Sequence, residues 1–362
     1  RFDQAYTSCP LCTPARAGLF TGMAPSRAGA YTNSQPLGDT VVTMGQRMTA
    51  AGYRCAYIGK WHLDAHDYFG TGECPPGWEH NFWYDGKRYL LDLTEDQARK
   101  WRTTWSNYDG LKADNLQSEM TWGHRISDKA ERFLDEQIDE RPYLLVCSYD
   151  EPHHPWTCPP EFVERASKLR IPLGPSTRDT LEGKPAHHRV WAQHMGRGDQ
   201  PVDEFHFPMF LGCNHYVDHL IGRVVRRAQA LAKKTGRPTW IIHTSDHGDH
   251  LGTHRLNNKG PSGYDFNIRI PLIIVPPEGA PSVQPSVVSH LDILPTLMEL
   301  AGVAMPPCLD GVSLRSLVGH GRRDDARRAF VEYTRYETAH DGFGGFEPLR
   351  VLVKWPWKIV IN

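Results

Sequence analysis

A continuous apolar segment, Tyr143 to Tyr149, most constrains what this chain can fold into. Strands covered on both faces of a parallel sheet have such uninterrupted apolar runs, whereas half-exposed strands alternate with polar residues. Apolar residues with helical spacing, Thr121 to Gln137, come directly before it, and further strands are predicted at residues 53–58, 239–244 and 270–275. The pattern indicates an α/β fold that contains a parallel sheet.

Composition excludes several other classes of protein. The 362 residues suffice for one large α/β domain or two smaller ones, and the formal net charge of −1 argues against nucleic acid or another polyanion as partner. No apolar run approaches membrane-spanning length. The eight cysteines are irregularly spaced, which favours a reducing, cytoplasmic compartment. A periplasmic location stays open, since the chain begins at Arg1 without a methionine.

Polar residues that could do chemistry follow three of the predicted strands. Lys60 and His62 come after the strand at 53–58, His153 follows the apolar segment, and Asp246 and His247 follow the strand at 239–244. In open α/β sheets, ligands bind at the carboxyl ends of strands. Adjacent carboxylate and imidazole groups at such an end are a plausible half-site for a metal ion. Taken alone, Lys60 and His62 fit an ordinary surface turn better, and a simple turn is the alternative for Asp246 and His247.

The segment from Ser8 to Gly22 places a thiol beside a predicted helix. Pro14 suits the first helical position, which puts Cys12 just before the helix N-terminus, where free amides and the helix dipole favour an anion. Arg16 adds a positive charge one turn further on. Two ordinary interpretations compete with a reactive thiol. Cys9 and Cys12 could form a redox pair or half of a zinc site, or Cys12 could be a buried structural cysteine.

The pattern from Cys12 to Gly22 resembles the signature of the formylglycine-dependent sulfatases. Four further segments resemble those of the same family and occur in the family's order: Gly59-Lys60-Trp61-His62, Pro152-His153-His154-Pro155, Ser245-Asp246-His247-Gly248, and Lys259-Gly260 with Tyr264. The chain is therefore similar to the type I sulfatases of the alkaline-phosphatase superfamily, most closely to a bacterial branch. Asp265 departs from the glutamate that is common in the family pattern.

The resemblance implies an alkaline-phosphatase-like fold, with a central, mostly parallel sheet sandwiched by helices and a small C-terminal sheet region only partly present. Residues 1–325 would form the catalytic α/β domain, and residues 326–362 would begin the C-terminal subdomain. The resemblance also implies sequence beyond both ends of this chain: upstream of Arg1, a strand with a metal-binding Asp-Asp pair, and beyond Asn362, the rest of the C-terminal subdomain.

The resemblance also implies the chemistry of the site. Cys12 would be oxidised to formylglycine by a separate maturation enzyme, and its hydrated form would be the nucleophile. A divalent cation, Ca²⁺ or else Mg²⁺, would be held by Cys12, Asp246 and His247. The implied catalytic residues are Cys12, Arg16, Lys60, His62, His153 and Lys259. Lys60 and Lys259 would neutralise sulfate oxygens, His153 would be the general acid, His62 the base, and Arg16 would orient the nucleophile.

The expected function is hydrolysis of a small-molecule sulfate ester, of a sugar or an aryl alcohol, without nucleic acid or membrane as partner. Residues expected near the substrate are His66, His154, Tyr264 and Arg335, with His154 also a competitor for the role of His153. One alternative is a phosphonate monoester or phosphodiester hydrolase with the same site. A less favoured alternative is a catalytically inactive, sulfatase-like binding protein. The oligomeric state stays open.

Overall fold

The computed structural model describes residues 1–362 apart from 66–67, 137–139, 195–203 and 343–345. The strands are β1 (Phe2–Tyr6), β2 (Arg54–Gly59), β3 (Tyr143–Ser148), β4 (Ile171–Pro172), β5 (Glu204–Phe205), β6 (Ile241–Thr244), β7 (Leu272–Val275), β8 (Gln284–Ser289), β9 (Ala329–Tyr333), β10 (Leu349–Lys354) and β11 (Trp357–Ile361). The helices are α1 (Cys12–Thr21), α2 (Pro25–Ala28), α3 (Met44–Ala50), α4 (Gly86–Leu91), α5 (Glu95–Arg102), α6 (Tyr108–Ala113), α7 (Trp122–Asp135), α8 (Pro160–Ala166), α9 (Ala186–His194), α10 (Pro208–Thr235), α11 (Asp265–Ile268) and α12 (Ile293–Leu300).

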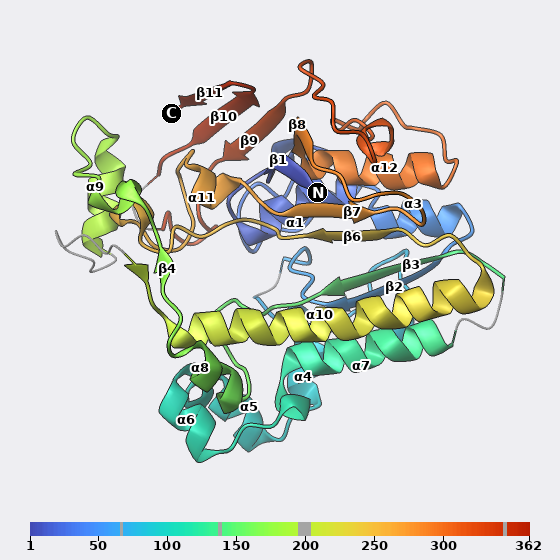
Figure 1. The fold of residues 1–362 in the computed structure, drawn as a ribbon, viewed down its shortest axis with the longest axis horizontal. Helices are drawn as coiled ribbons and strands as arrows, with labels where there is room; N and C mark the ends of the chain where they lie inside the picture. Colours follow the sequence, from blue (N-terminus) through green and yellow to red (C-terminus); the bar gives the residue numbers. More distant parts are fainter. Residues whose placement is uncertain (66–67, 137–139, 195–203, 343–345) are drawn as a thin grey trace.

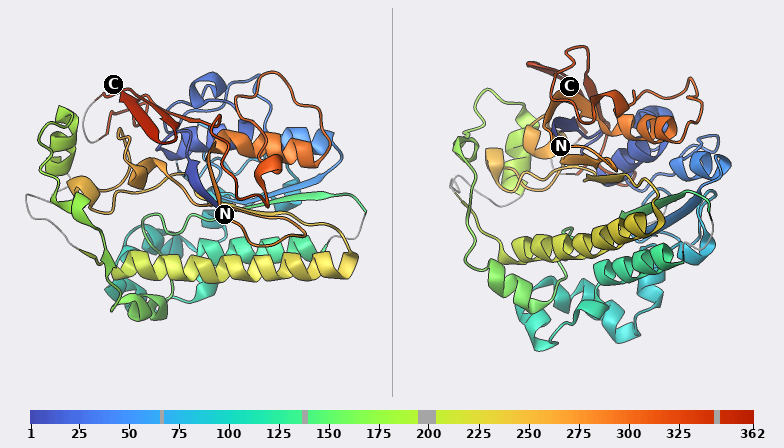
Figure 2. Two further views of the ribbon diagram at one scale, coloured as in Figure 1. Left: turned by 45° about the horizontal axis from the view of Figure 1, so that its top comes forward. Right: turned by 45° about the vertical axis from the view of Figure 1, so that its right-hand side comes forward.

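Helices cover the central strands on two sides, as Figure 1 shows. The long helix α10 and helix α7 lie side by side below the β2–β3 pair, and α1, α3 and α12 lie on the other side of the strands. The two views in Figure 2 place the small C-terminal sheet on the side of the molecule away from α10. The α/β fold with strands sandwiched by helices is thus confirmed.

The central strands are mostly parallel in direction. One sheet has the order β6-β7-β1-β8, in which β1 pairs with β8 in parallel while β7 runs antiparallel to both β1 and β6. Strands β2 and β3 form a separate parallel pair. Because β7 is the reversed strand, the carboxyl ends of β1, β6 and β8 point the same way. None of the helices in the described ranges has the length and apolar character needed to cross a bilayer.

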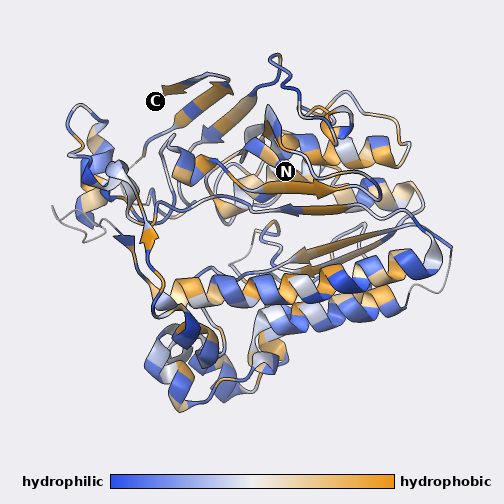
Figure 3. Ribbon diagram, viewed as in Figure 1, coloured by the Kyte–Doolittle hydropathy of each residue, from blue (hydrophilic) through white to orange (hydrophobic). Residues whose placement is uncertain are grey.

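Two apolar cores hold these layers together. One lies between α1, α12 and the strands and includes Trp61 and Trp78, and the other is rich in aromatic rings and lies under α4 to α7. In the second core, Tyr89 and Trp122 stack with ring centroids 5.7 Å apart. The segment between β2 and α7, polar and aromatic with weak periodicity, forms short helices around this cluster. Figure 3 shows hydrophobic strands between helices that carry both hydrophobic and hydrophilic residues.

Three local predictions need correction. Helix α1 begins at Cys12 itself, so Pro14 is its third residue; the first four helical N–H groups have no intrahelical partner, so proline is tolerated there too. The sequence predicts a helix capped by Asp39 or Thr40 and running to about Ala51, but helix α3 begins after Thr43, whose side chain accepts from the Gln46 amide. The predicted buried strand at 270–275 is covered on one face only, since Ile273 and Val275 are exposed.

The C-terminal strands form their own antiparallel sheet, with the order β11-β10-β9. Strands β10 and β11 form a hairpin, with Lys354 paired to Trp357 across Trp355 and Pro356. One face of this sheet packs through Val331 and Val351 against the residues that precede α1. The sheet thereby packs against and supports the segment that leads to Cys12.

Candidate active site

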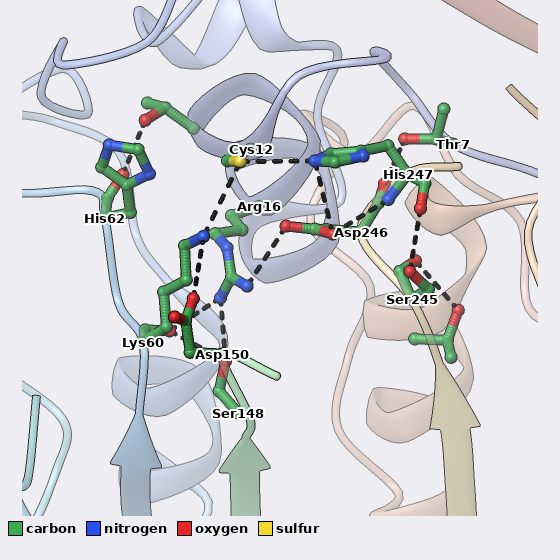
Figure 4. A network of polar contacts seen from close by, with 12 residues as sticks. Thr7, Cys12, Arg16, Lys60, His62, Ser148, Asp150, Ser245, Asp246 and His247 are labelled. Atoms are coloured by element: carbon green, nitrogen blue, oxygen red, sulfur yellow. Dashed lines mark hydrogen bonds and ion pairs between the residues drawn. The ribbon is translucent and has the colours of Figure 1, made fainter. Parts of the chain in front are cut away.

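The carboxyl ends of three strands meet at the first turn of α1, as Figure 4 shows. Lys60 follows β2, Asp150 lies two residues after the end of β3, and Asp246 and His247 follow β6. Their side chains are directed toward Cys12. A strand end exposes polar backbone and fixes side-chain direction, so this edge of the fold gathers charged groups from distant parts of the chain.

Cys12 is buried and is surrounded by cationic side chains. The Nζ atom of Lys259 lies 2.9 Å from its Sγ, and the Nζ atom of Lys60 lies 3.8 Å from it. The Nε2 atom of His247 lies 3.3 Å from the same sulfur. Burial alone would raise the pKa of the thiol, but Lys259, Lys60 and His247 together hold that pKa well below its ordinary value. The site is therefore built to hold negative charge at residue 12.

Arg16 ties the three strand ends to α1. Its guanidinium donates to the carbonyl of Lys60 at 2.7 Å and to the hydroxyl of Ser148 at 2.9 Å. It also pairs with the carboxylate of Asp246, with the Nη2 and Oδ2 atoms 3.2 Å apart. Since the guanidinium is almost fully buried, this fork of planar donors fixes the positions of β2, β3 and β6 relative to Cys12.

Lys60 is placed by a close approach of β2 to β3. Gly59 has φ +118°, and a Cβ atom there would lie 2.0 Å from the carbonyl oxygen of Ser148. Only glycine permits this geometry. The Nζ atom of Lys60 then lies 3.4 Å from Oδ1 of Asp150, and both side chains are almost fully buried. The ion pair compensates the burial of the ammonium group and holds it beside Cys12.

Two histidines from different loops face the same point. His62 has a left-handed backbone, with φ +59°, and its ring reaches hydrogen-bonding range of the Cys12 thiol. Burial lowers the pKa of His62, and Cys12 opposes that shift. His153 also helps to lower the pKa of the Cys12 thiol, and its Nδ1 lies 2.8 Å from the carbonyl oxygen of His154. Because Nδ1 donates to that carbonyl, Nε2 of His153 is the nitrogen left for the site.

Cys12, Asp246 and His247 could hold a metal ion, since one donor atom from each lies within 4.8 Å of the other two. Nδ1 of His247 donates to the carbonyl of Gly248 at 2.9 Å, which directs Nε2 toward Cys12. Burial raises the pKa of Asp246, but His247 and Arg16 outweigh it, so the carboxylate stays ionised. An oxygen donor at residue 12 would suit Ca²⁺ or Mg²⁺ better than the thiol sulfur does.

A family model described as sulfatase matches residues 1–303. This chain belongs to the sulfatase family. It is 46% identical over 367 residues to the protein of Escherichia coli (strain K12) called uncharacterized sulfatase YidJ. The matched region covers 100% of this chain and 71% of that protein. It is 28% identical over 388 residues to the choline-sulfatase of Rhizobium meliloti (strain 1021), covering 99% of this chain and 70% of the relative.

The architecture is shared with solved structures of the same fold. The phosphonate monoester hydrolase of Silicibacter pomeroyi superposes with a TM-score of 0.76 at 21% identity, covering 99% of this chain and 79% of that one. At that identity the likeness shows the alkaline-phosphatase-like fold alone. The family match and the sulfatase relatives together show that this sulfatase is an enzyme that hydrolyses sulfuric esters.

The substrate residues expected from the sequence do not all lie with Cys12. The ring of His154 packs on Trp156, with centroids 4.7 Å apart, and His154 is exposed. Tyr264 stacks on His254, with centroids 3.7 Å apart, in a separate cluster of histidines. Arg335 of this sulfatase pairs with Asp341 at 2.9 Å. His66 lies outside the described residues. These four assignments stay predictions.

Sequence reasoning missed two residues of this sulfatase. Asp150 pairs with Lys60, and the only sequence signal was its position at the carboxyl end of an apolar strand. Tyr68 contacts Asp150 through its hydroxyl group and comes from a loop with no sequence pattern of its own.

Cys9 lies apart from the site. It is buried in the core beside the C-terminal sheet, and burial raises the pKa of its thiol. Both cysteines of the Cys-x-x-Cys pair are free, so no disulfide joins Cys9 to Cys12.

Proposed function

We propose that this sulfatase hydrolyses the sulfate ester of a small alcohol or phenol, with residue 12 in its formylglycine form. The observation that carries the proposal is the convergence of Lys60, Lys259 and His247 on the Cys12 side chain. Two buried ammonium groups beside a carboxylate–imidazole pair suit an anionic sulfate group together with a divalent cation. The Sγ atom occupies the position at which the oxygens of the oxidised residue would stand.

The two lysines bind the sulfate group. Both Nζ atoms lie within 4 Å of the residue-12 side chain and belong to segments far apart in the sequence. Burial opposes the charge on Lys259, and in the thiol form negative charge at Cys12 raises the pKa of Lys259 above the ordinary value. In the formylglycine form, the anionic sulfate group would favour the ammonium in the same way. Fixed positive charge at that place stabilises the oxygens of a sulfuryl group as they gain charge. Water that would screen this interaction is excluded by the surrounding side chains.

The two histidines, His153 and His62, act as general acid and general base. His153, with Nδ1 donating to a backbone carbonyl, presents Nε2 and can protonate the departing alcohol oxygen. His62 is buried and its pKa is lowered, so near neutral pH its imidazole is a neutral base. It can accept the proton of the second hydroxyl when sulfate leaves. Arg16 acts through position, because it fixes the strand ends that carry Lys60 and Asp246.

A divalent cation fits the donors of residue 12, Asp246 and His247, and Ca²⁺ or Mg²⁺ would lower the pKa of a hydroxyl group at residue 12 and polarise a sulfate oxygen. Ca²⁺ takes roughly six to eight oxygen ligands. These residues alone therefore do not complete its shell, and the remaining ligands must come from substrate, water or other parts of the protein. A separate maturation enzyme is implied by the oxidation of Cys12.

Phosphonate monoester or phosphodiester hydrolysis is the second candidate. The likeness to the phosphonate monoester hydrolase fold supports it, and phosphorus and sulfur esters differ mainly in charge. The two lysines, with His62 and His153, would suit either centre. Sulfate esters remain the first proposal because the choline-sulfatase relative is similar over almost the whole chain.

The test is a comparison of 4-nitrophenyl sulfate with bis(4-nitrophenyl) phosphate, using protein produced together with a formylglycine-generating enzyme. We expect the sulfate ester to have the higher kcat/KM, and Cys12→Ala to abolish its hydrolysis without changing the thermal midpoint. A higher kcat/KM for the phosphodiester would favour the second candidate. Undiminished activity of Cys12→Ala would contradict the proposal altogether.

A further inference from the structure

Tyr68 touches four groups of the candidate site at once. Its hydroxyl group contacts the carboxylate of Asp150. The Nζ atom of Lys60 lies over its ring, 4.1 Å from the centroid. The ring also packs against His153, with centroids 4.8 Å apart, and meets His62 edge-on at 5.9 Å. No other described aromatic ring contacts both Lys60 and His153.

The neighbouring residue anchors Tyr68 in the protein core. Phe69 is buried, packs edge-on against Trp101 at 5.2 Å, and its backbone carbonyl accepts from the Lys87 amide at 2.9 Å. The backbone of Phe69 lies so close to Gly86 that a Cβ atom there would come within 2.9 Å of it. This anchoring sets the place from which the Tyr68 ring extends toward Lys60.

The contacts of Tyr68 join two groups with different roles. Lys60 and the Tyr68 hydroxyl meet the same oxygen of Asp150, so the hydroxyl group shares the negative charge that otherwise binds the ammonium. The ring face attracts the same ammonium group electrostatically. The Tyr68 ring also packs against the imidazole ring of His153 at an interplanar angle of 34°, and this contact sets the tilt of the imidazole. The sulfate-binding cation and the proton donor are thus held by one aromatic side chain.

We propose that Tyr68 is a positioning residue that fixes His153 relative to Lys60, so that the proton reaches the leaving oxygen while the lysine holds the sulfate. This inference rests on the proposed function, in which His153 is the general acid. It also names a substrate class. Esters of alcohols, including sugar hydroxyls, expel a basic oxygen and depend on protonation, whereas a nitrophenolate leaves readily without it. The contacts of Tyr68 serve hydrolysis of alkyl sulfates above all.

The test measures kcat/KM for an alkyl sulfate and for a series of aryl sulfates of increasing phenol acidity. General acid catalysis contributes about 10²–10⁴-fold, and misplacing a group by about 1 Å forfeits a large part of such a factor. We expect Tyr68→Leu to lose about 10²-fold on the alkyl sulfate and less than about 5-fold on 4-nitrophenyl sulfate. Tyr68→Phe retains the ring, so its dependence on leaving-group acidity should match the wild type while its KM rises, since Asp150 then binds Lys60 alone.

Tyr108→Leu is the matched control. Its hydroxyl group also donates to a carboxylate, that of Glu164 at 2.8 Å, and its ring also lies near a lysine, Lys112 at 5.8 Å. It should leave both substrates unchanged. Equal losses on all substrates for Tyr68→Leu, or no loss, would overturn the proposal. If the leucine variant does not fold, an unchanged KM of Tyr68→Phe would likewise overturn the proposal.

The outcome separates this inference from the proposed function. Absence of all sulfate hydrolysis in the wild type bearing formylglycine would end both. If the wild type is active and His153→Ala steepens the dependence on leaving-group acidity while Tyr68→Leu does not, then only the role of Tyr68 is wrong. If both variants steepen it, Tyr68 and His153 act in one unit, and the double variant should lose no more than His153→Ala alone.

Discussion

Replacing Lys259 with methionine should separate activity from stability. The Nζ atom lies 2.9 Å from Sγ of Cys12 and 3.1 Å from Nε2 of His247, and the side chain is 5% exposed. A unit charge about 3 Å from an ammonium group interacts by about 5–6 kcal/mol at an effective dielectric of about 20. Only the part gained on reaching the transition state appears in the rate. By analogy with single oxyanion-hole donors, we expect a loss of about 10²–10³-fold in kcat/KM.

Stability should move in the other direction. Neither partner of the Lys259 ammonium is a carboxylate, and in the formylglycine form the anionic thiol is gone. The buried charge, which is expensive to desolvate, then contributes little to folding. Methionine fills nearly the same volume without that charge, and we expect the thermal midpoint to stay or to rise. The assay is kcat/KM on 4-nitrophenyl sulfate beside a thermal melt, with the exposed Lys233→Met as control. A fall in stability with activity retained would refute the reasoning.

Two further predictions concern pH and metal. Burial, with a smaller effect from Asp150, raises the pKa of Glu151 to about 7 from 4.5. The folded state therefore binds more protons than the unfolded state between these values, so Glu151 costs stability as pH rises from about 4.5 to 7, by up to about 3 kcal/mol. Glu151→Gln should flatten this dependence in denaturant titrations at pH 5 and 8, and an unaltered slope would contradict it. Treating the active protein with a chelator should abolish turnover, and added Ca²⁺ or Mg²⁺ should restore it; full activity after exhaustive chelation would remove the metal from the account.

Much of the fold could be predicted from local patterns. The apolar run at β3 and the spacing of α7 and α10 follow from burial on one or both faces, which a sequence displays directly. The reversal of β7 could not be predicted, because strand direction depends on which neighbour the chain returns to and not on its own residues. The start of α3 shows a similar limit, since Asp39, Thr40 and Thr43 are all suitable caps and tertiary packing selects one.

The candidate site shows the same division. Lys60 and Asp246 stand at predicted strand ends, so position alone indicated them. Asp150 stands at one too, but a carboxylate next to a Pro-His segment is also ordinary turn composition. Tyr68 could not be predicted, since its place depends on how Phe69 packs in the aromatic core far from the site. Residues that follow a strand can be found from their position and Lys259 from its resemblance to a family segment, whereas Tyr68, which has neither signal, needs the structure.

The central claim is that residue 12 works as an aldehyde and not as a thiol. Its most direct test is to prepare the protein with graded amounts of a formylglycine-generating enzyme and to plot specific activity on 4-nitrophenyl sulfate against the aldehyde fraction at Cys12, measured by peptide mass spectrometry. The account predicts a straight line through the origin. Full activity in protein whose Cys12 is entirely thiol would contradict it.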